Sequence, residues 1–227
     1  DSTGALSLPE RPKSMAILGG GVIGVEFASV WNSYGADVTI IEGLPNLVPN
    51  EDLAVSKTLE RAFRKRGIKF QTKTMFDRVE QNANGVTVYT QNGKTFQADY
   101  LLVAIGRGPA TANLGYEEVG IAMDRGFVLT NERLETNVPG VYAVGDIVPG
   151  LQLAHRGFLQ GIFVAEELAG LDPKVIVENY IPRVTFCNPE IASVGLNQNK
   201  AEEIYGKENI EAVEFNLAGN GKSQMLG

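Results

Sequence analysis

Three glycines near the start of the chain have the spacing of a phosphate-binding turn. Gly19, Gly21 and Gly24 follow the apolar residues 15–18 and precede an apolar segment typical of a helix. In such a turn the first glycine permits a tight reversal from strand to helix, the second lets a pyrophosphate approach the backbone, and the third lets the helix pack closely on the strand. The free amides and the dipole at the helix start favour an anion. The pattern therefore predicts a dinucleotide site.

An acidic residue at the end of the next expected strand is spaced to bind a ribose. Residues 36–42 are typical of a strand, and its last residue, Glu42, follows Gly24 by 18 positions. A carboxylate accepts hydrogen bonds from the 2′- and 3′-hydroxyls of NAD and repels the 2′-phosphate of NADP. The next three residues, 43–45, offer no cation for that phosphate. We therefore expect a preference for NAD, the alternative being that Glu42 is only a solvated strand end.

The expected elements around these residues form an α/β, Rossmann-like fold. Strands at 15–18, 36–42 and 68–71 alternate with helices at 22–34 and 52–66, which makes a βαβαβ unit with a parallel sheet. Three short alternating segments, 77–81, 86–89 and 94–98, follow as an antiparallel meander with Asn-Gly turns. The apolar run 100–105 then predicts a buried strand that ends at Gly106.

A second group of polar residues lies farther along the chain. Residues 141–146 predict a strand that ends in Gly145 and Asp146, and a helix is expected at about 154–168. An aspartate at a strand end can accept hydrogen bonds from the polyol of a second nucleotide cofactor. The helix start at Gln152 to His155 would favour negative charge on an electron-rich ring. Alternatively, Asp146 is a turn residue and His155 an ordinary helix-start residue.

Composition limits the classes of partner. The chain has 227 residues, of which 44% are hydrophobic and 21% charged, as in a soluble globular protein with one large or two small domains. Its net charge of -7 argues against a nucleic-acid partner, and the basic residues at 61–69 are expected on a solvated helix face. No apolar stretch has the length of a membrane span. We expect no membrane association and a cytoplasmic location, or an organellar one if a presequence is absent.

Cysteine and histidine usage limits the chemistry. Cys187 is the only cysteine, so the chain forms no internal disulfide, and we expect a core thiol. His155 is the only histidine, so we expect no metal site.

Several motifs resemble, in order and spacing, those of the dihydrolipoamide dehydrogenase family of flavin disulfide reductases. The resemblance covers essentially the whole chain, and the Leu-Ala-His of residues 153–155 is specific to the lipoamide branch. The motifs lie at residues 17–26, 105–107, 142–146, 153–155 and 189–195.

The resemblance implies roles for individual residues. Two cofactors are implied, NAD and FAD. Glu26 matches a glutamate that pairs with a lysine beside the flavin, Phe76 matches an adenine contact and Gly106 a backbone contact to NAD. The implied NAD-binding residues are Gly19, Gly20, Gly21, Val22, Ile23, Gly24, Glu26, Glu42, Phe76 and Gly106. The implied FAD-binding residues are Asp146, which matches the ribityl ligand, and Gln152, Leu153, Ala154 and His155.

The resemblance also implies a domain order. Residues 1–108 correspond to an NAD-binding domain, 109–176 to the second segment of an FAD-binding domain, and 177–227 to the start of an α+β interface domain of a homodimer. The first FAD-binding half, the Cys-x4-Cys pair and the C-terminal His and Glu have no match, and neither His155 nor Cys187 replaces them. The chain is thus expected to be a fragment that carries no catalytic residue.

The implied reaction belongs to the intact enzyme. Dihydrolipoamide, carried by the lipoyl domain of a 2-oxoacid dehydrogenase acyltransferase, reduces the cysteine pair, and electrons pass through FAD to NAD. The chain alone is expected to be inactive. One alternative is another flavin reductase, of the transhydrogenase, mercuric or glutathione reductase type. The other is a nucleotide-binding fragment without enzymatic activity.

Overall fold

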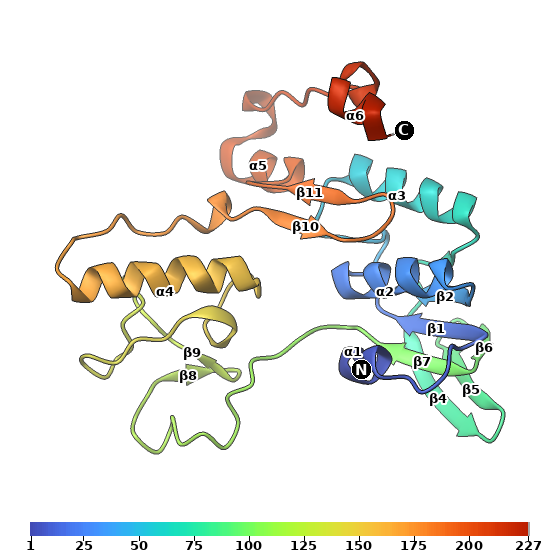
Figure 1. The fold of residues 1–227 in the computed structure, drawn as a ribbon, viewed down its shortest axis with the longest axis horizontal. Helices are drawn as coiled ribbons and strands as arrows, with labels where there is room; N and C mark the ends of the chain where they lie inside the picture. Colours follow the sequence, from blue (N-terminus) through green and yellow to red (C-terminus); the bar gives the residue numbers. More distant parts are fainter. Residues whose placement is uncertain (227) are drawn as a thin grey trace. The chain divides into compact units, whose positions relative to one another are not determined.

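A computed structural model describes residues 1–226 of the chain (Figure 1). The chain divides into two compact units, Asp1–Gly195 and Leu196–Gly227. The first unit begins with a short helix, α1 (Ser2–Leu6), which the sequence did not predict. Among the described residues, no helix is both long and apolar enough to cross a lipid bilayer.

A parallel sheet forms the centre of the nucleotide-binding part. Its strand order is β3-β2-β1-β7, and β1 pairs in parallel with both β2 and β7. The bounds are β1 (Ser14–Leu18), β2 (Asp37–Ile41), β3 (Lys69–Gln71) and β7 (Tyr100–Val103). The helices α2 (Val22–Ser33) and α3 (Leu53–Arg66) connect the first three strands (Figure 1). The predicted βαβαβ unit is therefore confirmed.

Alternate residues of the strands supply two apolar layers, because successive side chains of a strand point to opposite faces. Met15 and Ile17 of β1 belong to a cluster with Val25 of α2 and Phe63 of α3. Ala16, Leu18 and Ile41 face the other way and pack with Val88 of the meander. The helices thus cover one face of the sheet and the meander covers the other.

The antiparallel meander is also confirmed. Its strands are β4 (Phe76–Asn82), β5 (Gly85–Thr90) and β6 (Thr95–Ala98), in the order β4-β5-β6. The backbone has a positive φ of 122° at Gly85 and 79° at Gly93, as expected for Asn-Gly turns.

The expectation of a buried strand over residues 100–105 is wrong in part. β7 ends at Val103 and lies at the edge of its sheet, with β1 as its partner. Val103 is 43% and Ile105 72% exposed, and only Leu102 is buried. A continuous apolar run indicates a strand covered on both faces, but an edge position leaves part of it open.

The expected strand at 141–146 does not form. Tyr142 makes one antiparallel bridge with Glu135, and Gly145–Ile147 is a single 3-10 turn, η1. A strand needs a neighbour for its backbone hydrogen bonds, and this segment has one bridge within residues 1–226.

The remaining elements of the first unit are few. The hairpin of β8 (Met123–Asp124) and β9 (Phe127–Val128) precedes the helix α4 (Ala154–Leu168), whose bounds match the prediction. A 3-10 turn, η2 (Glu178–Tyr180), leads to the antiparallel pair β10 (Arg183–Thr185) and β11 (Ile191–Ser193). Cys187 and Ile191 belong to the same apolar cluster as β1 and α2.

The described part of the second unit, residues 196–226, contains the helices α5 (Gln198–Tyr205) and α6 (Gly221–Leu226). Between them lie the 3-10 turns η3 (Lys207–Asn209) and η4 (Leu217–Gly219). Several large apolar side chains of this unit are exposed, among them Val213, Phe215 and Met225.

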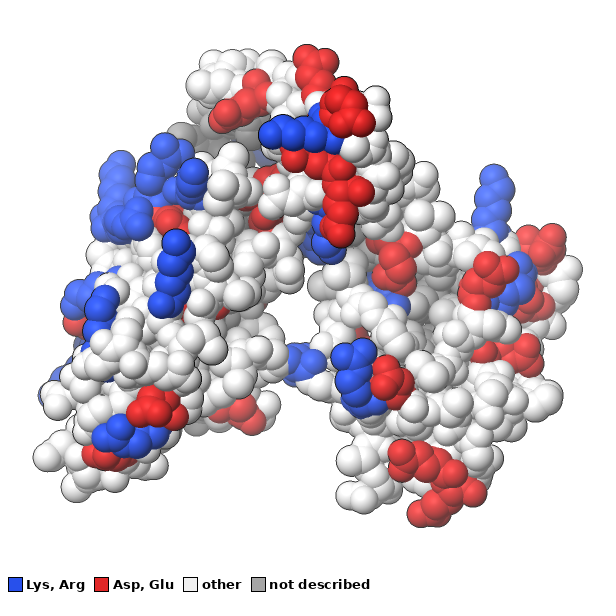
Figure 2. Space-filling model, turned by 180° about the vertical axis from the view of Figure 1, so that it is seen from behind, with Lys and Arg blue, Asp and Glu red and all other residues white. Residues whose placement is uncertain are grey.

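Charge is distributed unevenly over the first unit. Lys and Arg side chains gather over α3 (Figure 2), where Lys57, Arg61, Arg64 and Lys65 are exposed. The predicted solvated basic face of this helix is confirmed in part, because Arg66 is half-buried and donates to the Asn188 carbonyl.

Candidate functional site

The turn between β1 and α2 requires glycine at its first position. Gly19 has a φ of 107°, and a Cβ there would overlap the carbonyl oxygen of Ala104, just after β7. The Gly19 amide donates to the carbonyl of Ile41, the last residue of β2, at 2.9 Å. The turn is therefore held between the carboxyl ends of β2 and β7, where ligands of parallel sheets bind.

The other two glycines of the motif differ in their surroundings. A Cβ at Gly24 would overlap the carbonyl oxygen of Gly19, so this residue permits the close approach of α2 to the turn. A Cβ at Gly21 would have no atom within 4 Å. Gly21 is the N-cap residue of α2 and provides no side-chain cap. The geometry fits an anion over Gly21, bound by the first amides of the helix.

The carboxylate of Glu42 is fixed against this turn. Glu42 is only 8% exposed, so it is not a solvated strand end. Its Oε2 accepts from the Gly20 amide at 2.5 Å, and its Oε1 accepts from the Leu44 amide at 2.6 Å. A carboxylate has about four acceptor positions, so two remain for hydroxyl donors. Binding of ribose by Glu42 stays a prediction.

Glu26 has a partner that the sequence did not indicate. Its Oε1 accepts from the backbone amide of Phe186 at 2.8 Å. Three residues on, Ser29 Oγ accepts from the Asn188 amide at 3.0 Å, and Arg66 donates to the Asn188 carbonyl at 2.8 Å. Glu26 thus helps to join α2 to the loop between β10 and β11.

The other residues predicted to bind NAD lie around the turn or on the meander. Val22 is 42% exposed and Ile23 is half-buried. Phe76 is half-buried against the meander-facing cluster of the sheet. Gly106 is exposed with a φ of 158°, and a Cβ there would meet no atom within 4 Å. Phe76 is therefore partly a core residue, whereas Gly106 leaves open space.

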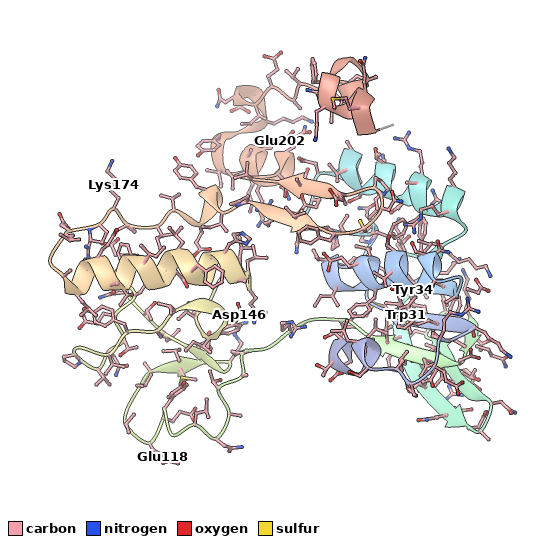
Figure 3. All side chains as sticks on the ribbon, in the orientation of Figure 1. Trp31, Tyr34, Glu118, Asp146, Lys174 and Glu202 are labelled. Carbon is pink, nitrogen blue, oxygen red and sulfur yellow. The ribbon has the colours of Figure 1, made fainter. Side chains whose placement is uncertain are left out.

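The residues predicted to bind FAD lie around the first turn of α4. Asp146 is exposed on η1, below the start of the helix (Figure 3). Gln152 Nε2 donates to the Asp146 carbonyl at 3.5 Å, and Leu153 is the N-cap residue of α4, which begins at Ala154. His155 Nε2 lies 2.7 Å from the Pro182 carbonyl, which can only accept, so this nitrogen is the donor.

Two buried polar residues of α4, neither indicated by the sequence, hold the Asp146 turn. Gln160 is 1% exposed, and its Oε1 accepts from the Gly145 amide at 2.7 Å. Arg156 is 2% exposed and donates to the carbonyls of Gly145 and Pro149. Between them, a Cβ at Gly157 would lie 3.4 Å from the Gly145 Cα. An exposed carboxylate on a fixed turn beside a helix start fits the polyol and ring of a flavin.

Cys187 has the properties of a core thiol. It is 4% exposed, and its Sγ donates to the Pro189 carbonyl at 3.1 Å. Burial raises the pKa of the thiol to about 11. Within residues 1–226, no group of three or more His, Cys, Asp and Glu side chains is arranged to hold a metal ion.

Cys187 is therefore expected to react slowly. At pH 8 the folded chain should react with a chromogenic disulfide reagent about 200-fold more slowly than the unfolded chain, because only the thiolate attacks. The buried thiol also makes the free energy of unfolding depend on pH. Its contribution is fully present below the unfolded pKa of about 8.5 and is lost as the pH rises toward the folded pKa of about 11. Denaturation curves at pH 8 and pH 10.5 measure this loss of stability. Equal thiol reactivity of the folded and unfolded chains would contradict the predicted slow reaction of Cys187.

Comparison with known proteins identifies the family. The profile of the family Pyridine nucleotide-disulphide oxidoreductase matches residues 1–161. The chain belongs to this family. The dimerisation domain of the pyridine nucleotide-disulphide oxidoreductases matches residues 181–227.

Individual relatives include dihydrolipoyl dehydrogenases and a flavoprotein disulfide reductase. Dihydrolipoyl dehydrogenases from Geobacillus stearothermophilus and Bacillus subtilis are 39% and 41% identical over 100% of the chain and 48% of their own lengths. The HOCl-induced flavoprotein disulfide reductase RclA from Escherichia coli superposes with a TM-score of 0.88 at 33% identity, covering 100% of this chain and 52% of its own. LpdA from Mycobacterium tuberculosis gives 0.87 at 28% identity, covering 97% and 48%. The chain spans about half the length of the curated relatives it matches.

Family membership confirms the fold class and the resemblance drawn from the motifs. Membership of this family implies the use of flavin and nicotinamide cofactors. The match to the dimerisation domain supports a homodimer in the family. The domain boundaries and the roles of individual site residues stay predictions.

Proposed function

We propose that the chain provides the NAD site and one wall of the FAD site of a dihydrolipoamide dehydrogenase. The observation that carries the proposal is the turn at Gly19–Gly24, which is open over Gly21 and has the buried carboxylate of Glu42 bound to its Gly20 amide. Identities of about 40% to dihydrolipoyl dehydrogenases along the whole chain support the lipoamide branch. The proposed electron donor is the lipoyl domain of an acyltransferase, and the proposed assembly is a homodimer.

The chain's own residues have distinct tasks in this proposal. The amides at the start of α2 bind the pyrophosphate, and Glu42 accepts from the adenosine ribose. Asp146 accepts from the ribityl chain of the flavin, and the helix start at Leu153–His155 favours negative charge on the ring. When bound, the flavin and the nicotinamide supply the electron and hydride chemistry. The protein contributes binding, orientation and charge.

The preference for NAD tests the proposal. Titration of the 227-residue chain with NADH and NADPH is expected to give at least about tenfold tighter binding of NADH, because a 2′-phosphate would lie against the Glu42 carboxylate. The shorter probes AMP and 2′,5′-ADP should show the same order, since they report on the ribose alone. Tighter binding of NADPH would overturn the assignment and favour another flavin reductase.

The same sample also tests the proposed inactivity of the chain. Cys187, the only cysteine, is buried in the core, so no cysteine pair is present to exchange with lipoamide. We expect no lipoamide reduction with NADH, and turnover by this polypeptide would contradict the proposal.

A further inference from the structure

Arg156 is a buried charged residue that neither the motif nor the proposed function assigns. It lies in the first turn of α4, directly after His155, and is 2% exposed. A buried guanidinium is costly unless its donors are paired, so its contacts indicate what the fold uses it for.

The guanidinium joins both ends of the turn that carries Asp146. Nη1 donates to the Gly145 carbonyl at 3.3 Å, and Nη2 donates to the Pro149 carbonyl at 2.6 Å. Gly150, with a φ of 124°, leaves room for this contact, because a Cβ there would overlap Nη2. Arg156 therefore binds the carbonyl side of residues 145–150, while Gln160 binds the Gly145 amide.

The carboxylate of Glu178 binds the remaining donor of that guanidinium, Nε. Arg156 Nε lies 2.8 Å from Oε1 and 3.0 Å from Oε2 of Glu178, whose side chain is 45% exposed. Glu178 begins η2, and His155 donates to Pro182 just beyond it. The first turn of α4 thus binds the segment that leads into the dimerisation-domain match, which begins at residue 181.

We propose that Arg156 and Glu178 are a positioning pair, which holds the 145–150 turn and so keeps Asp146 in place for the flavin polyol. The pair acts through the turn and does not itself touch the cofactor. Glu178 belongs to the segment before the dimerisation domain. A well-ordered conformation of that segment is therefore needed to keep the 145–150 turn well ordered. This inference rests on the proposed function for the identity of the ligand, but its geometry does not.

Hydrogen exchange of the turn amides tests the pair in the 227-residue chain. Glu178→Gln keeps the side-chain volume and removes the charge, and should speed exchange at Gly145 and Val148 by about tenfold. Arg156→Lys keeps the charge but loses the planar fork that reaches two carbonyls and a carboxylate together, and should have a similar effect. Glu178→Asp keeps the carboxylate, so the exchange rates of the same turn amides should stay within about threefold of those of the parent chain.

A second ion pair on α4 provides the matched control. Arg133 pairs with Glu167 in the last turn of the helix, away from Asp146. Glu167→Gln should leave the 145–150 amides unchanged, and the amides of β1 should keep their protection in every variant. If Arg156→Lys does not fold, Glu178→Gln alone carries the test.

Two results would overturn the pair. One is unchanged turn exchange in Glu178→Gln, and the other is equal loosening of the turn by Glu167→Gln. NADH titration of the same samples reports separately on the proposed function, because Glu178 and Arg156 lie outside the NAD site. A parent chain that binds no NADH would overturn that function without altering the exchange result.

Discussion

Alanine at position 24 is expected to weaken NADH binding by at least about tenfold and to destabilise the fold by about 2 kcal/mol. Its Cβ would overlap the carbonyl oxygen of Gly19, so α2 must move away from the turn. The helix start would then no longer face the pyrophosphate at the same distance. NADH titration measures the loss of affinity, and urea denaturation measures the loss of stability.

Gly21→Ala provides the control, because it separates folding from binding. Gly21 has an ordinary φ of -72°, and a Cβ there meets no protein atom within 4 Å. The fold should therefore keep its stability to within about 0.5 kcal/mol. Its affinity for NADH should still fall, since the methyl group occupies the space assigned to the pyrophosphate. Unchanged affinity in Gly21→Ala would place the dinucleotide elsewhere.

Glu42→Ala is expected to affect both properties as well. The buried amide of Gly20 and the amide of Leu44 would lose their acceptor, at a cost of about 1–3 kcal/mol. NADH affinity should also fall, because the ribose hydroxyls lose the carboxylate that accepts their hydrogen bonds. Denaturation and titration of the same samples measure the two losses.

Two further substitutions make this test specific. Asp37, at the other end of β2, pairs with Lys69 at 2.8 Å on the surface, so Asp37→Ala should be nearly neutral. Glu42→Gln keeps the volume but removes the charge, and should narrow the preference for NADH over NADPH. Unchanged NADH affinity in Glu42→Ala would remove Glu42 from the site.

Local sequence patterns were sufficient to predict the sheet, the meander and α4. The glycine spacing and the apolar runs around it are short-range signals, which is why β1, α2 and β2 were predicted close to their observed bounds. The errors at residues 100–105 and 141–146 have a common cause. An apolar run indicates that a segment favours a strand, but not how many neighbouring strands it will have.

The residues that fix the site are the ones that the sequence did not indicate. Arg156, Gln160 and Arg66 are polar residues of amphipathic helices, where such side chains are usually solvated. Their partners lie up to 122 positions away, as with Arg66 and Asn188. Contacts over such distances depend on the tertiary fold, and a single sequence carries no local signal for them.

The placement of Cys187 and Ile191 among the side chains of β1 and α2 bears on how the chain folds. Ser29 and Asn188 are 159 positions apart, yet they are joined by a hydrogen bond. Closing so long a loop costs conformational entropy before its contacts form, which slows folding. During synthesis, the layer that carries the glycine turn therefore completes its apolar core only after the β10–β11 loop has been made. The apolar core of the nucleotide-binding layer thus includes two residues that lie within the dimerisation-domain match.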